Sequence, residues 1–154
     1  MNDADPQCEW RALTSANDIE ELMRLFGDFH DGCVHEIHAV TGHYVHDNLS
    51  MSVGWETTVR LLIQRQFSDP SAIELRFDEV VGFRLSPPAP NYDAIIYGAA
   101  FFIRDGIYYW ADNAGWKPEF PERGDTTWVS ARKVSWRDAS NWMGPDLRYL
   151  TADD

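Results

Sequence analysis

The pattern of apolar and polar positions first predicts a short amphipathic helix near residue 20. Apolar side chains recur there at spacings of three and four residues, which places them along one face of a helix. They are Ile19, Leu22, Met23 and Phe26. Ser15 precedes this stripe and Asp18 follows three positions later, an arrangement that caps the start of a helix. Gly27 comes after the last apolar residue, and we expect the helix to end there.

Beyond the turn residues Asp31 and Gly32, the pattern changes to the two-residue alternation of β-strands. Residues 33–40 form the first predicted strand. Between residues 49 and 56, apolar side chains alternate with polar or small ones, which predicts a strand with one buried face. Apolar side chains continue at odd-numbered positions toward residue 67. Gly54 predicts a bulge or bend within this long stretch.

The second half of the chain contains the remaining predicted strands. They lie at residues 73–85, 94–103, 107–111 and 126–137. The second of them is the longest apolar run in the chain, so we expect it at the centre of the sheet. Asp105 and Gly106 favour a type I′ turn, which predicts that the two strands around them form a hairpin.

This order of elements predicts an α+β fold that is mainly antiparallel β. The N-terminal helix would pack on a curved β-meander of about seven strands, arranged as a sandwich or a half-barrel. We find no linker and no repeat, so residues 1–154 are expected to form a single domain. Residues 1–14 and 138–154 are expected to be partly irregular.

The ends and the cysteines of the chain indicate a soluble, cytoplasmic protein. The first ten residues combine acidic residues with a proline and lack the basic and apolar stretches of a secretion signal. Residues 94–103 are too few to span a membrane, which takes about 20 apolar residues. Cys8 and Cys33 are therefore expected to stay reduced, with Cys33 acting as a small buried residue.

The charge balance restricts the partners that the protein could bind. Its 25 acidic and 13 basic residues give a net charge of −12. Nucleic-acid binding requires a basic surface, so a DNA or RNA partner is disfavoured, and we expect no membrane partner. An acidic surface serves solubility, and it also suits a basic partner protein.

Histidines are the most unusual feature of the composition, because all five fall within residues 30–46. A metal site would draw on His30, His35 and His38, with a nearby aspartate as a further ligand. However, residues 35 and 38 point to opposite faces of a strand, so we favour histidines scattered over the surface. We expect no cofactor, and this metal site is kept as an alternative.

The loop after the predicted hairpin contains the residues that we expect to contact a partner. The sequence lacks the signatures of a nucleophile elbow, a phosphate-binding loop or a dinucleotide-binding loop, so no catalytic residue is proposed. Trp110 is expected in the core and Trp116 on the surface. The candidate contact residues are Asp112, Asn113, Trp116 and Glu119.

One short motif resembles that of known bacterial families. The turn Phe29-His30-Asp31-Gly32 resembles an F-H-D-[GSA]-x-[IVL] turn that opens a β-rich domain, and residues 73–77 and 80–83 resemble later parts of the same families. The resemblance covers about residues 26–85. Some of these families are uncharacterised, and others are immunity proteins of polymorphic toxin systems. The resemblance therefore implies a non-enzymatic protein that binds and blocks a toxin.

These observations favour a non-enzymatic, cytoplasmic binding protein, in its narrower form an immunity-type inhibitor that meets a basic toxin through an acidic surface. The alternative is a metal-dependent enzyme or a small-molecule-binding protein that uses residues 30–46. A homodimer without chemistry of its own is a third possibility, because the edges of long strands invite pairing.

Overall fold

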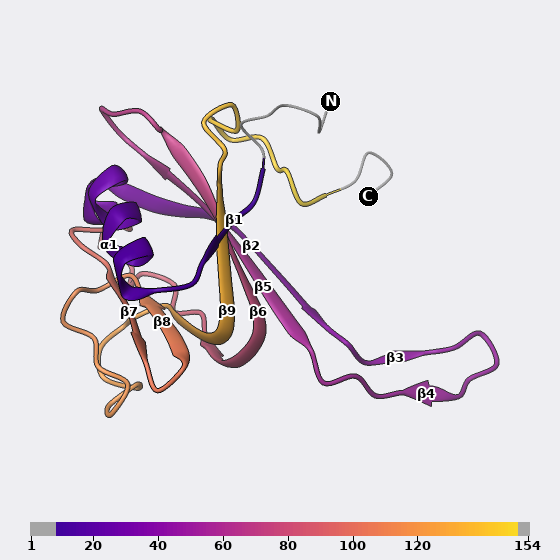
Figure 1. The fold of residues 1–154 in the computed structure, drawn as a ribbon. Helices are drawn as coiled ribbons and strands as arrows, with labels where there is room; N and C mark the ends of the chain where they lie inside the picture. The colour runs from indigo at the N-terminus through magenta and orange to yellow at the C-terminus, as the bar shows by residue number, and fades with distance from the viewer. Residues whose placement is uncertain (1–8, 151–154) are drawn as a thin grey trace.

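A curved antiparallel sheet with one helix against its face makes up the body of the protein (Figure 1). The structure, a computed structural model, describes residues 9–150. The elements in chain order are β1 (Arg11–Leu13), α1 (Ala16–Leu25), the 3-10 turn η2 (Gly27–Phe29), β2 (Gly32–Thr41), β3 (Tyr44–Val45), β4 (Met51–Ser52), β5 (Thr57–Arg65), β6 (Ala72–Arg84), β7 (Ala100–Arg104), β8 (Ile107–Ala111) and β9 (Trp128–Asp138). The predicted α+β class, mainly antiparallel β with an N-terminal helix, is confirmed.

The sheet has the strand order β2-β5-β6-β9-β8-β7, and β1 also pairs with β9. The last strand, β9, therefore lies between β6 and β8, where the sheet departs from chain order. A single bridge joins Gly32 to Ile96, but the sheet does not close into a barrel. This bridge holds the segment before β7 against the start of β2.

The helix α1 forms where the apolar stripe predicts it. The Ser15 hydroxyl accepts a hydrogen bond from the Asp18 backbone N–H at 3.1 Å, which satisfies one of the unpaired donors at the helix start. Ile19 and Leu22 are buried against the sheet, as is Phe26 just after the helix. Each such side chain contributes roughly 1.5–3 kcal/mol of burial free energy.

The predicted hairpin is confirmed, but the predicted central position of residues 94–103 is wrong. Asp105 and Gly106 have positive φ angles of 52° and 77°, and they connect β7 to β8. However, β7 begins only at Ala100 and is the end strand of the sheet. In the segment before it, Ile96 and Ala99 are buried, whereas Ile95 and Tyr97 are exposed.

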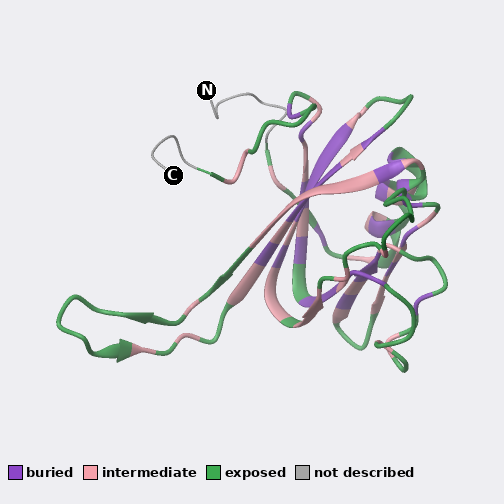
Figure 2. Ribbon diagram, turned by 180° about the vertical axis from the view of Figure 1, so that it is seen from behind, coloured by how far each residue is buried: buried purple, intermediate pink, exposed green. Residues whose placement is uncertain are grey.

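The predicted buried strand at residues 49–56 is also wrong. Residues 42–56 form a two-stranded arm, made of β3 and β4, that projects from the body (Figure 1). Figure 2 shows that the arm is exposed along most of its length. The alternation of apolar and polar residues predicts a strand with one apolar face, but it does not show whether other residues cover that face. The arm has no second layer to cover it among the described residues.

Two further predictions concern residues at the ends of the chain and the cysteines. The predicted irregular ends, residues 1–14 and 138–154, lie partly outside the described residues, which begin at residue 9 and end at residue 150. Cys8 lies wholly outside them. Within them, β1 forms a short strand in the predicted lead-in. Cys33 is a free thiol that is half-buried, and burial raises its pKa.

Candidate functional site

The arm is ordered by its own hydrogen bonds. Tyr44 pairs with Ser52, and Val45 pairs with Met51. At the tip, the His46 N–H donates to the Ser50 carbonyl at 2.8 Å and closes the turn. The arm therefore has a defined hairpin geometry, although an isolated two-stranded hairpin in water is only marginally stable.

The exposed apolar side chains of the arm are its main chemical feature. Trp55 is 99% exposed and Leu49 is 84% exposed. The other large exposed apolar side chains of the arm are Tyr44, Val45, Met51 and Val53. Large exposed apolar patches often mark interaction sites, so the arm is a candidate binding surface.

Two glycines fix the base of the arm. A Cβ atom built on Gly54 would lie 2.6 Å from the Gly42 carbonyl oxygen, closer than real Cβ atoms approach other atoms. The two sides of the arm can lie this close at its base because neither Gly42 nor Gly54 has a side chain. The predicted bend at Gly54 corresponds to this close approach.

A cleft in the body of the protein is the second candidate site. It has a volume of about 910 Å³ and is formed by β2, by residues 85–98 and by residues 112–127. Val34 and Ile37 give it an apolar wall on the β2 side, and Tyr92 and Tyr97 present rings from the facing loop. Small-molecule sites are clefts of about 300–1,000 Å³ with mostly apolar walls and a few polar groups, so the dimensions of this cleft suit a small ligand.

The turn formed by residues 29–32 holds one wall of the cleft in place. The Asp31 N–H donates to the Ile96 carbonyl at 2.9 Å, and the His30 ring nitrogen Nδ1 donates to the Tyr97 carbonyl at 2.8 Å. The Asp28 carbonyl accepts from the Ala99 N–H at 3.0 Å. Asp28, His30 and Asp31 thus hold residues 96–99 in place, three of which line the cleft.

The backbone of this turn is strained. Positive φ angles occur at Asp28, Phe29 and Asp31, with values of 56°, 64° and 61°. Such conformations cost non-glycine residues about 1–3 kcal/mol each and persist only where the surroundings enforce them. Here the buried ring of Phe29 contacts Phe26 edge-on, with the ring centroids 5.1 Å apart, and anchors the turn in the core.

Asp112 and Asn113, two of the predicted contact residues, lie together at the cleft. The Thr127 N–H donates to Asp112 Oδ1 at 3.1 Å, and the Asp112 N–H donates to the Thr127 carbonyl at 3.0 Å. Partial burial raises the pKa of Asp112 to about 6, although the hydrogen bond from Thr127 acts in the opposite direction. Asn113 accepts a hydrogen bond from the Gly115 N–H at 2.8 Å, which shapes the loop.

The other two predicted contact residues lie outside this cleft. The expected exposure of Trp116 is wrong, because its side chain is 6% exposed. Its ring stacks on Trp128 with the centroids 5.3 Å apart, and its indole N–H donates to the Pro121 carbonyl at 3.3 Å. Glu119 is half-exposed and forms an ion pair with Arg104 on β7. The structure thus divides the four predicted residues between two places.

The histidines of the alternative metal site do not converge. His30 contacts the Tyr97 carbonyl, His35 Nε2 donates to the Asp146 carbonyl at 3.2 Å, and the His38 ring lies against that of Tyr149. His46 lies on the arm. Within residues 9–150, no three His, Cys, Asp or Glu side chains are close enough to hold a metal ion. The alternative site therefore lacks a ligand set in the part of the chain that the structure describes.

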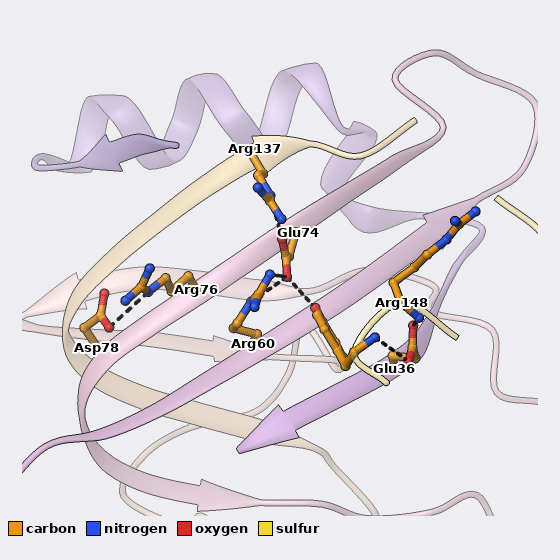
Figure 3. A network of polar contacts seen from close by, with 8 residues as sticks. Glu36, Arg60, Glu74, Arg76, Asp78, Arg137 and Arg148 are labelled. Atoms are coloured by element: carbon orange, nitrogen blue, oxygen red, sulfur yellow. Dashed lines mark hydrogen bonds and ion pairs between the residues drawn. The ribbon is translucent and has the colours of Figure 1, made fainter. Parts of the chain in front are cut away.

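The densest cluster of charges has a structural role (Figure 3). Glu74 is fully buried and accepts hydrogen bonds from Arg60, Arg137 and the Tyr149 hydroxyl, each at 2.7 Å. Burial, followed by the charge of Glu74, raises the pKa of Tyr149, which keeps its hydroxyl a donor. The cluster connects β5, β6 and β9 to the C-terminal segment. The Glu74 carboxylate at its centre accepts a hydrogen bond from each of the three donors.

Comparison with protein-family models, curated proteins and solved structures finds no match to this chain. Among residues 9–150, no helix is long and apolar enough to cross a membrane. The resemblance to immunity families remains a prediction. The arm and the cleft are therefore the two candidate functional surfaces of the described residues.

Proposed function

We propose that this protein acts by binding a basic partner protein and that the arm is the element that contacts this partner. The observation that carries the proposal is the number of large apolar side chains exposed on residues 42–56, with Trp55 as the most exposed of them. Tryptophan is among the residues that contribute most to protein interfaces when a partner covers them. Trp55 lies at the base of the arm, next to Gly54, and almost its whole surface is open to such a partner. The arm itself extends away from the body (Figure 2).

The energetics favour a partner that covers the arm. Removal of apolar surface from water yields about 25 cal/mol per Å², so burial of several large side chains would contribute several kcal/mol to binding. The hairpin is already formed, with paired strands and a closed tip, so binding would not have to order a flexible chain. The outer edges of β3 and β4 can also accept a further strand.

Charge favours a basic partner over a second copy of the chain. Residues 42–56 contain no Lys or Arg, but they do contain Asp47 and Glu56. The whole chain has a net charge of −12, so two copies would repel one another while a basic protein would be attracted. An immunity-type inhibitor of a basic toxin is the narrower form of this proposal, and the resemblance of residues 26–85 supports it.

Photo-crosslinking in the native cells tests this proposal. A photoreactive phenylalanine analogue is placed at position 55 on the arm and, as a matched control, at position 67, where Phe67 is also highly exposed but belongs to the β5–β6 loop. We expect position 55 to form an adduct with a protein rich in Lys and Arg, and position 67 to form none with that protein. The identified protein must then bind the purified chain with an affinity that falls in high salt.

Two results would contradict the proposal. One is an adduct of position 55 with a second copy of this chain, which would make the arm a dimer contact. The other is the same set of adducts from positions 55 and 67, which would mean that the arm has no specific partner.

A further inference from the structure

We infer that the cleft binds a small organic cation, an amine carried on an apolar body about the size of one or two aromatic rings. The cleft is separate from the arm in sequence, so this inference goes beyond the proposed function and does not depend on it.

The volume and the walls indicate a small apolar body. At about 910 Å³ the cleft lies within the range of small-molecule sites. Apolar side chains from β2 and prolines from the β6–β7 loop line it, including Ile37, Pro87 and Pro88. Tyr92 and Tyr97 also line the cleft, and both are largely exposed. The face of an aromatic ring attracts a cation that lies within about 6 Å.

The charges of the lining have a single sign. Asp93, Asp112 and Asp125 line the cleft, and among the described residues that line it there is no Lys, Arg or His. Asp93 is engaged locally, since its carboxylate accepts from the Ile95 N–H and the Tyr97 hydroxyl. Asp112 accepts from the Thr127 N–H but has no cationic neighbour in the lining. An amine is the group that would balance it.

The partial burial of Asp112 favours a cationic ligand. Its carboxyl lies where partial burial penalises the charged form and raises the pKa to about 6. An ammonium group beside it would favour the ionised form, which is the effect that an opposite charge within about 4–6 Å has on a carboxyl. A ligand with this charge is therefore bound more favourably than a neutral ligand of the same shape.

Three indole probes with one ring and different charges test the inference. Tryptamine is a cation, tryptophol is its neutral counterpart and indole-3-acetate is an anion. Each is titrated into the ¹⁵N-labelled full chain, and amide shifts of residues 92–98 and 112–114 are followed. We expect tryptamine to shift these signals and saturate, tryptophol to bind at least about tenfold more weakly, and indole-3-acetate not to bind.

Two variants assign the effect to Asp112. In Asp112→Asn, tryptamine should lose about tenfold in affinity while the affinity for tryptophol is unchanged. Asp105→Asn makes the same charge change in the β7–β8 turn, away from the cleft, and should leave tryptamine binding unaltered. If Asp112→Asn fails to fold, the comparison of tryptamine with tryptophol on the native chain still decides the question.

Several outcomes would overturn the inference. Equal affinity for tryptamine and tryptophol would make the cleft merely apolar, and shifts outside the cleft would place the site elsewhere. A further probe is Nα-acetyl-lysine amide, whose side-chain amine is free. If it binds more tightly than tryptamine, the cleft would instead be assigned to a lysine side chain of a protein partner. Removal of the arm should leave tryptamine binding unchanged, so failure here and failure of the proposed function can be told apart.

Discussion

Glu74 shows how a single buried residue can hold this sheet together. Its carboxylate has no exposed surface, and it receives donors from β5, from β9 and from the C-terminal segment (Figure 3). A buried charge is tolerated only when it is paired and hydrogen-bonded, and removal of one partner leaves the others uncompensated. Arg60 and Arg137 each form an ion pair with this carboxylate.

We predict that Glu74→Gln lowers the free energy of unfolding by about 3–5 kcal/mol, because two arginines then lose a buried counter-charge. Asp78→Asn is the matched control, since Asp78 lies on the same strand and pairs with Arg76 where both are partly exposed. That change should cost about 1 kcal/mol or less. Urea unfolding measures both values, and equal losses would show that Glu74 has no special structural role.

Asp112 gives a pH-dependent prediction. The folded protein raises the pKa of this carboxyl from 3.8 to about 6, so the folded state holds the proton more tightly between these values. The stability that this group contributes is therefore present below about pH 4 and is lost as the pH rises through 6. We expect Asp112→Asn to gain about 1 kcal/mol relative to the native chain between pH 4 and pH 7, a value reduced because solvent reaches the group.

The measurement for Asp112 is urea unfolding of both proteins across this pH range. A side-chain NMR titration of the native protein provides a second reading, with a midpoint near 6. A midpoint near the ordinary value of 3.8, together with parallel stability curves, would contradict the prediction.

Trp110 and Trp116 show when the burial of a residue can be predicted from the sequence and when it cannot. Trp110 lies on an alternating strand, and its burial was predictable from that pattern. Trp116 lies in a loop, and its burial depends on stacking with Trp128, which is twelve positions further along. No local pattern records that contact, so the expectation of an exposed ring was wrong.

At the scale of elements, local patterns predicted the period of each strand but not its surroundings. The cap at Ser15 and the turn at Asp105 and Gly106 are local features, and both form as predicted. The arm alternates in the same way as a buried strand, and only its lack of a covering layer makes it different. Gly42 and Gly54, at the base of the arm, are a sequence feature that could have indicated a separate hairpin.

We predict that the arm can be removed without loss of the fold. Replacement of residues 43–55 by Asn-Gly joins β2 to β5 just beyond the last pair of their ladder, Thr41 with Thr57. Because the removed side chains bury little, the melting temperature should change by no more than a few degrees. Circular dichroism during heating measures this, and loss of cooperative unfolding would show that the arm supports the body.

At the scale of the whole molecule, the fold class followed from the order of elements, but the topology did not. One helix followed by alternating segments predicted an antiparallel α+β fold. The insertion of β9 between β6 and β8 depends on pairs such as Leu75 with Trp136, which lie far apart in sequence. The cleft was equally hidden, because it forms only where β2 and two loops meet. Asp112 and Asn113 were predicted to contact a partner, which stays a prediction, and the structure places both in the lining of the cleft. The other residues that line the cleft were not predicted.

The charge of the whole molecule supports the same account of function. Under the proposed function, a net charge of −12 would attract a basic protein, and the exposed apolar side chains of the arm would then form the contact surface. Long-range attraction affects the rate of association and is weakened by salt, whereas the apolar contact mainly governs the rate of dissociation. The two contributions can therefore be separated by salt and by substitution.

The most direct test of this account is the affinity of the crosslinked partner for three purified proteins, measured by calorimetry in low and in high salt. The proteins are the native chain, Trp55→Ser on the arm and the matched control Phe67→Ser on the β5–β6 loop. We predict that Trp55→Ser weakens binding at least about tenfold, that Phe67→Ser leaves it unchanged, and that high salt weakens the native complex. Equal affinities of the two variants, or an affinity that does not respond to salt, would contradict the account.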